Sequence, residues 1–212
     1  GEDPAQAWNA LTVGGTTIKS EITERGYRDW SGWARPGERS PYSRTTTLWR
    51  SSQSPIKPEI VFEAGNRALS RSGSEAVSGL PSLSLLTTSK SAGANSVTPF
   101  WATSAATAQA GRMAACIMAE HPDYWPETVR ALMVHSARWT PHMLGEFNGC
   151  ASKSDRKNLA RKYGYGVPDL KRALASASND LALVAQRYIQ PFRIEDGSVR
   201  FSDSHVYRLP WP

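Results

Sequence analysis

The chain contains few cysteines and lacks a long apolar run. Cys116 and Cys150 are its two cysteines, and neither has a second Cys or a His at the spacing of a zinc site. No apolar stretch approaches the roughly 20 residues that a membrane-spanning helix requires. The first residues are acidic, whereas a secretory signal begins with basic residues and continues with an apolar run. These absences favour a cytoplasmic protein without a disulfide framework, and we expect no metal, no cofactor and no membrane partner.

The charge of the chain is basic but weakly organised. Its 25 Lys and Arg residues exceed its 19 Asp and Glu residues, which gives a net charge of +6. The basic side chains are densest in residues 153–162 and 35–50, and neither segment has the spacing of a basic recognition helix or a zinc finger. We interpret the excess as solvated loop or helix surface, so nucleic-acid binding is the least favoured function. A hydrophobic fraction of 40% is sufficient for a packed core.

Short apolar runs in the first half of the sequence and helical patterns in the second half predict an α/β protein. The expected strands cover residues 8–15, 60–62, 83–89 and 97–102, and a polar segment without periodicity occupies residues 19–55. The expected helices cover residues 105–120, a segment that opens at Pro126 and a segment that opens at Pro168. The tail, residues 192–212, alternates weakly and ends in HVYRLPWP, which predicts a strand followed by prolines.

Ser104 is the residue of greatest chemical interest. It stands at the mouth of the predicted helix 105–120, in which small side chains dominate: Ala105, Ala106, Ala108, Ala110, Gly111, Ala114 and Ala115. Such a helix can lie close against a sheet and be buried nearly all round. A hydroxyl at its start can cap the helix by accepting a backbone N–H bond, which is the common use of serine there. The same hydroxyl can be a nucleophile, because a helix N-terminus offers positive potential and free N–H groups to an oxyanion.

Several motifs accompany Ser104 in a fixed order. They are WNALTVGG (8–15), KPEIV (57–61), ATSAAT (102–107), VRALMVHSA (129–137) and YGYGVPDLKRAL (163–174). In this order they resemble the C-terminal half of the subtilisin-like serine peptidases. In that family a Lys-Pro-Asp/Glu strand ending in Ala-Pro-Gly precedes a Gly-Thr-Ser-Met-Ala motif at the start of a buried helix. The resemblance implies a subtilisin-like parallel sheet flanked by helices, with Ser104 as the nucleophile and its backbone N–H as one oxyanion-hole donor.

The resemblance also implies that part of the peptidase domain is missing from this sequence. The family's triad runs Asp, His, Ser along the chain, and its Asp, its His and its oxyanion asparagine precede the strand that residues 8–15 match. We therefore expect residues 1–190 to be the C-terminal portion of the domain, with the N-terminal half absent. We expect residues 191–212 to be an extension or a link to a further domain. Such a fragment should be inactive, because a serine without a base is a poor nucleophile.

The expected partners follow from the same resemblance. In the full-length protein they are a protein or peptide substrate and the missing N-terminal part of the same domain. A sheet surface left bare by that missing part is expected to favour self-association.

Departures from the family pattern keep a second hypothesis open. Ala102 stands where the family has the glycine before Thr-Ser, and Thr107-Ala108 stand where the family's motif closes with proline. All four histidines follow Ser104 in the chain: His121, His135, His142 and His205. We expect each histidine to be a core or surface residue rather than a relocated base. The second hypothesis is a non-catalytic relative that uses the same scaffold for binding or regulation.

Overall fold

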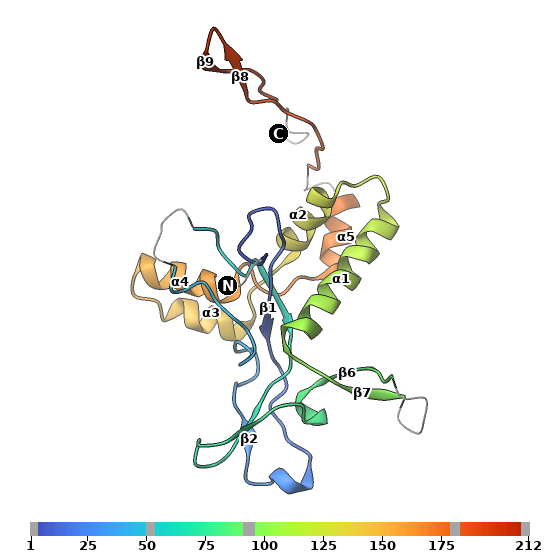
Figure 1. The fold of residues 1–212 in the computed structure, drawn as a ribbon, viewed down its shortest axis with the longest axis vertical. Helices are drawn as coiled ribbons and strands as arrows, with labels where there is room; N and C mark the ends of the chain where they lie inside the picture. Colours follow the sequence, from blue (N-terminus) through green and yellow to red (C-terminus); the bar gives the residue numbers. More distant parts are fainter. Residues whose placement is uncertain (1–3, 50–53, 91–95, 179–182, 209–212) are drawn as a thin grey trace.

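The computed structural model describes residues 4–49, 54–90, 96–178 and 183–208. Its helices are α1 (Ala102–Glu120), α2 (Pro126–Ser136), α3 (Pro141–Asn148), α4 (Lys153–Tyr163) and α5 (Leu170–Ser178). Its strands are β1 (Val13–Thr16), β2 (Ser31–Gly32), β3 (Ile60–Glu63), β4 (Ala68–Leu69), β5 (Ala76–Val77), β6 (Leu85–Thr88), β7 (Val97–Phe100), β8 (Phe192–Glu195) and β9 (Ser198–Phe201). The chain is a mixed α/β protein, as its sequence predicts (Figure 1). Among the described helices, none is long and apolar enough to cross a membrane.

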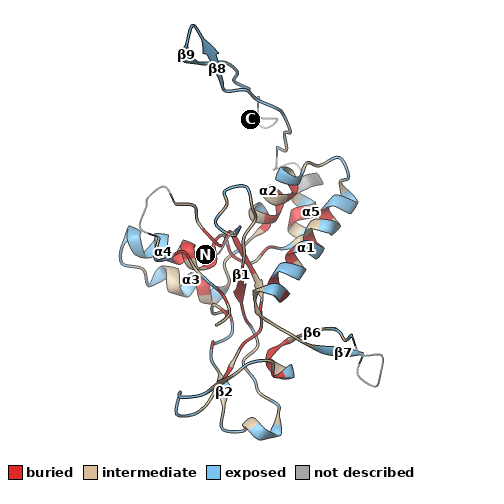
Figure 2. Ribbon diagram, in the orientation of Figure 1, coloured by how far each residue is buried: buried red, intermediate tan, exposed pale blue. Residues whose placement is uncertain are grey.

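Strands β1 and β3 form a parallel pair at the centre of the molecule (Figure 1). In its register Val13 lies beside Ile60. Alternate side chains of a strand point to opposite faces of a sheet, and Ile60 and Val61 are both 0% exposed. Ile60 packs with side chains of α1, α2 and α5, whereas Val61 packs with side chains of α3 and α4. Helices therefore cover β3 on both faces, and the buried residues gather along this pair (Figure 2).

The outer edges of the parallel pair are also occupied. Segment 37–43 runs beside β1, where the carbonyl of Gly15 accepts the N–H of Ser40 at 3.0 Å. Beside β3, the N–H of Val61 donates to the carbonyl of Gly166 at 2.9 Å. The pair therefore does not present an open edge at these positions.

The other described ladders are antiparallel, and β8–β9 is a hairpin that stands apart from the body (Figure 1). Its turn is Asp196-Gly197, with φ of 52° and 73°. Two left-handed residues of this kind are typical of a type I′ turn, which matches the twist of a hairpin. The strand predicted in the HVYR segment is not observed at residues 205–208, because the Asp-Gly turn places the paired strands at 192–201 instead.

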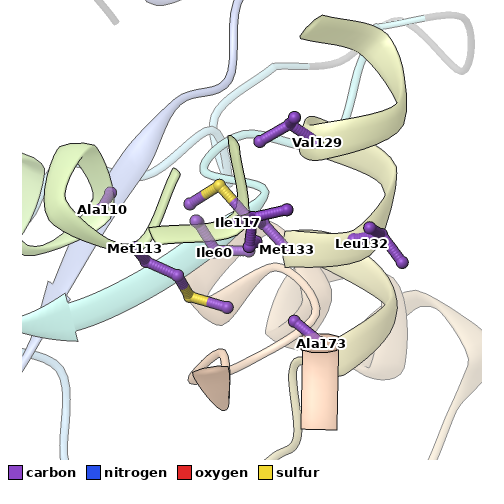
Figure 3. Close-up of a cluster of buried hydrophobic side chains, with 8 residues drawn as sticks. All are labelled: Ile60, Ala110, Met113, Ile117, Val129, Leu132, Met133 and Ala173. Atoms are coloured by element: carbon purple, nitrogen blue, oxygen red, sulfur yellow. The ribbon is translucent and has the colours of Figure 1, made fainter. Parts of the chain in front are cut away.

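Helix α1 packs its small side chains against the parallel pair. Ala106 and Ile117 are 0% exposed and Ala110 is 5% exposed, so one face of the helix is buried as expected. The expectation that the helix is buried nearly all round is wrong, because Ala108, Gly111 and Ala115 are exposed on its other face. Ile117 lies in a core cluster with residues of β3, α2 and α5 (Figure 3). The helix begins at Ala102, three residues earlier than the sequence pattern predicts.

The basic segment 153–162 forms most of α4 and is exposed over its first half. This agrees with its interpretation as solvated surface. The sequence periodicity predicts neither α3 nor α4 as a helix, because each buries few side chains. The buried side chains are Met143 in α3 and Leu159, Arg161 and Tyr163 in α4.

A polar cluster around Glu146 joins α3 to α4. Its carboxylate accepts bonds from Tyr163 Oη at 2.6 Å and Lys162 Nζ at 2.6 Å, and His142 Nε2 lies 3.1 Å from it. Tyr163 Oη in turn accepts the N–H of Arg39 at 3.2 Å, so the cluster also holds the loop beside β1. Burial alone would raise the pKa of the Glu146 carboxyl, but the bonds from Lys162 and Tyr163 outweigh it and keep this pKa below its usual value. Burial, together with the bond to Glu146, raises the pKa of the Tyr163 hydroxyl.

Protonation of Glu146 is expected to loosen this cluster. A carboxyl group whose pKa is lower in the folded chain than in the unfolded chain stabilises the folded chain at pH values above its unfolded pKa. This contribution is lost as the pH falls through the folded pKa. Glu146→Gln should therefore lower the free energy of unfolding at pH 7 by about 1–3 kcal/mol. The difference from the parent chain should shrink in urea melts near pH 3. Glu75→Gln, at an exposed position, is the control. An equal loss at both pH values would contradict this account.

Ile117 should be among the residues on which stability depends most. Ile117→Ala removes a side chain that is 0% exposed between β3 and α2, and it should lower the free energy of unfolding by about 2–5 kcal/mol. The neighbouring Met118 is 50% exposed, so Met118→Ala should change it by only about 0.5 kcal/mol. Urea denaturation of both variants tests this packing of α1. Similar losses of unfolding free energy in the two variants would show that this packing is wrong.

Candidate active site

Helix α1 begins at the carboxyl end of β3. The N–H of Ala102, the first helical residue, donates to the carbonyl of Ala64, directly after β3, at 2.8 Å. Trp101 is the N-cap residue and is extended, with φ of −143° and ψ of −171°. Binding sites of open α/β sheets lie outside the carboxyl ends of the strands. The start of α1 therefore occupies a position where chemistry is expected.

Ala102 has a left-handed backbone. Its φ is +68°, a conformation that costs an L-residue roughly 1–2 kcal/mol and that glycine adopts freely. Ala102 is the residue that takes the place of the family's glycine before Thr-Ser. Ala102 thus holds a backbone conformation that glycine adopts freely, but it does so with a methyl group.

The ring of Trp101 lies directly against the backbone of Gly79. A Cβ atom at Gly79, whose φ is +81°, would lie 2.8 Å from the Trp101 ring. A Cβ atom at Gly65, whose φ is +74°, would lie 2.7 Å from the carbonyl oxygen of Leu83 and 3.4 Å from Cβ of Trp101. The close approach of the Trp101 ring requires glycine at position 79, whereas at position 65 glycine is required by the carbonyl of Leu83. It fixes the residue that immediately precedes the helix.

Ser104 is the third residue of α1 and is exposed. The first four N–H groups of a helix have no acceptor within the helix, so the N–H of Ser104 belongs to the positive end of α1. The N-cap position is occupied by Trp101, which makes no side-chain cap, and in the described chain Ser104 Oγ makes no hydrogen bond. The capping interpretation of Ser104 is therefore wrong. What the geometry provides is an accessible hydroxyl beside backbone donors.

The histidines do not meet this hydroxyl in the part of the chain that the structure describes. His121 follows the last residue of α1, so it lies about 25 Å from Ser104 along the helix axis. His135 is exposed in the last turn of α2, His142 belongs to the Glu146 cluster, and His205 lies in the exposed tail. Over the same residues, no three His, Cys, Asp or Glu side chains are grouped so that they could hold a metal ion.

Asn66 follows the turn after β3, and its side chain is used to hold the fold rather than to bind an oxyanion. Its side-chain amide donates to the carbonyls of Lys19 at 2.7 Å and Ala34 at 2.8 Å, and its oxygen accepts the N–H of Ala34 at 3.1 Å and of Arg67 at 2.9 Å. A carboxamide has two donor hydrogens, so both are used and Asn66 has none left for an oxyanion. It joins three loops below β3.

A pocket of about 270 Å³ reaches the residue before Ser104. Its lining includes Thr103, Gly14 and Pro58 from the core side, and Tyr42 and Arg44 from the loop beside β1. Larger cavities of about 750 and 950 Å³ lie along α2 instead. The pocket that adjoins the first turn of α1 is therefore smaller than the two cavities along α2, so pocket size does not single out the surroundings of Ser104.

A comparison with known families indicates a serine-peptidase-type domain. The model of the subtilase family matches residues 1–166, so the chain belongs to the subtilase family. No curated protein and no solved structure matches the chain.

The left-handed conformation of residue 102 predicts opposite effects for two identical substitutions in α1. Ala102→Gly should raise the free energy of unfolding by about 1 kcal/mol, because it removes the cost of a methyl group at positive φ. Ala108→Gly, at an exposed position inside the same helix, should lower it by about 0.5–1 kcal/mol. Thermal and urea melts of both variants provide the measurement. A loss of stability in Ala102→Gly would show that the residue does not hold this conformation.

Proposed function

We propose that the chain is the nucleophile-bearing part of a subtilisin-like serine endopeptidase domain, with Ser104 as the nucleophile. The observation that carries the proposal is the exposed Ser104 hydroxyl in the first turn of α1, two residues after a left-handed residue 102. The subtilase match, which includes this segment, supports the same reading. The substrate class is a protein or peptide.

The proposed reaction is acyl transfer. Ser104 Oγ attacks the carbonyl carbon of the scissile peptide bond, and a histidine of the complete domain takes the hydroxyl proton and passes it to the leaving amine. The carbonyl oxygen becomes an oxyanion that accepts a hydrogen bond from the backbone N–H of Ser104, whose place in the first turn supplies both the donor and positive potential. Water then releases the acyl group from Ser104.

We further propose that this chain is inactive alone. The family's order of Asp, His and Ser places the base in a segment that precedes the one matched by β1, and that segment would be the principal partner of residues 1–190. Residues 191–212 would form an extension or a link to a further domain, in keeping with the β8–β9 hairpin, whose strand residues are all exposed. Self-association through an exposed sheet surface remains a further proposal, and the exposed apolar side chains of the β8–β9 hairpin, including Phe192 and Phe201, support it.

A non-catalytic binding or regulatory module is the second candidate. The observation that favours it is Ala102, because a methyl group stands beside the nucleophile where the family has glycine. Nucleic-acid binding remains the least favoured candidate, since the exposed basic residues of α4 are the main support for it.

Replacing Ser104 in the complete subtilase domain separates these candidates. Ser104→Ala should reduce peptide turnover by more than about a thousandfold. It should hardly change the melting temperature, because Ser104 Oγ has no hydrogen bond in the described chain and alanine is the best helix former. Ser154→Ala, on the exposed face of α4, should change neither quantity.

Labelling by a fluorophosphonate probe provides the second measurement. The complete domain should be labelled at Ser104, and the 212-residue chain should be labelled barely or not at all. Comparable turnover by the Ser104→Ala domain would overturn the peptidase proposal. A correctly folded complete domain that neither turns over peptide nor reacts with the probe would favour the binding module.

A further inference from the structure

Glu63, the last residue of β3, holds two backbone segments with one carboxylate. Its Oε1 accepts the N–H of Gly65 at 2.8 Å, and its Oε2 accepts the N–H of Ile18 at 2.7 Å. The backbone carbonyl of Glu63 accepts Nε2 of Gln109 at 2.7 Å, and the same nitrogen donates to the carbonyl of Ala105 at 3.0 Å. Glu63 is thus connected both to the turn that follows β3 and to the first turns of α1.

The turn that Glu63 holds is the support on which α1 begins. Ala64, between Glu63 and Gly65, is 0% exposed, and its carbonyl accepts the N–H of Ala102 at 2.8 Å. That bond is made by the residue with φ of +68°, two positions before Ser104. A shift of the 63–65 turn would therefore move the acceptor that fixes the backbone before the nucleophile.

Other bonds hold this turn together with the Glu63 carboxylate: the N–H of Ala64 donates to the carbonyl of Thr16 at 2.9 Å, and Ser40 Oγ donates to the carbonyl of Gly65 at 2.7 Å. Residues 63–65 contain no proline to stiffen them, and Gly65 is the most flexible residue type. Ala102 would relax toward negative φ if its N–H lost its acceptor, because a left-handed backbone is disfavoured for alanine. Hydrogen bonds from two N–H groups to an ionised carboxylate are strong enough to oppose such relaxation.

We propose that Glu63 is a positioning residue for Ser104, an inference that rests on the proposed peptidase function. Through Gly65 and Ala64, its carboxylate fixes residue 102, and residue 102 sets the direction of Ser104 Oγ and of the Ser104 N–H. Glu63 contacts neither substrate nor the reacting atoms in this role. It acts on the rate of acylation by holding the nucleophile and the oxyanion donor in register.

The first experiment measures the restraint itself on the 212-residue chain. The two N–H groups bond to different oxygens of Glu63, and in Glu63→Gln one of these oxygens becomes an NH2 group that cannot accept, so the 63–65 turn should loosen. Amide hydrogen exchange followed by NMR should become at least about tenfold faster at Ala102. Asp155→Asn also removes one negative charge and a carboxylate bonded to a backbone N–H, but in the first turn of α4, and it should leave exchange at Ala102 unchanged. Unchanged exchange in Glu63→Gln would overturn the inference.

The second experiment measures peptide turnover by the complete domain. Glu63→Gln should lower kcat by about tenfold to a hundredfold with little change in KM, because a small misplacement of a reacting group has effects of this size. Asp155→Asn should leave both constants unchanged. Glu63→Asp keeps the charge but is one methylene shorter, and it should give an intermediate kcat; it is the test variant if Glu63→Gln does not fold.

Two controls separate this inference from its alternatives. If Glu63 only stabilises the fold, Glu63→Gln will lower the melting temperature and the fraction of domain labelled by fluorophosphonate, while the labelling rate constant of the folded fraction stays unchanged. That result would overturn the positioning role. Turnover that survives in Ser104→Ala would instead overturn the peptidase function. Loss of turnover in Ser104→Ala with normal kcat in Glu63→Gln would overturn only the role of Glu63.

Discussion

The parallel pairing of β1 with β3 is the constraint on which the rest of the structure depends. Ile60 and Val61 are adjacent in the chain and point to opposite faces, and both are fully buried. One face receives α1, α2 and α5, and the other receives α3 and α4. Burial of this kind provides most of the driving force for folding, so packing against the side chains of β3 determines where the helices lie. The position of the candidate nucleophile is one consequence of this arrangement.

The path from β3 to Ser104 is short in space although it is long in sequence. β3 ends at Glu63, the carbonyl of Ala64 accepts the N–H of Ala102, and α1 then runs back along the strands. Small side chains such as Ala106 and Ala110 let the helix lie close to the sheet. The positive end of α1 is thereby placed at the carboxyl end of β3, where developing negative charge can be stabilised.

The elements predicted from sequence are those that local pattern specifies, and the remainder depends on distant contacts. The apolar stripe of α2 and the small side chains of α1 are local, so both helices were predictable. Helix α4 is mostly charged and has a narrow apolar stripe, but Ser152 and Asp155 form a capping box that marks its start in the sequence. The bond from the N–H of Ala102 to Ala64 and the bond from the N–H of Ile18 to Glu63 join segments far apart in the chain. No periodicity or propensity of a single segment contains that information.

The case for Ser104 as a nucleophile is strengthened by what its hydroxyl does not do. A serine at the start of a helix is usually explained by capping, and capping requires the residue that precedes the first helical one. Trp101 has that place, fixed against Gly79, and it leaves Ser104 two positions inside the helix. There the described contacts give its hydroxyl no part in holding the fold, although the backbone around it is held by Ala64 and Gln109. A held backbone that presents an unengaged hydroxyl beside free N–H groups supplies the nucleophile and the oxyanion donor of the proposed acyl transfer, whose base would come from the complete domain.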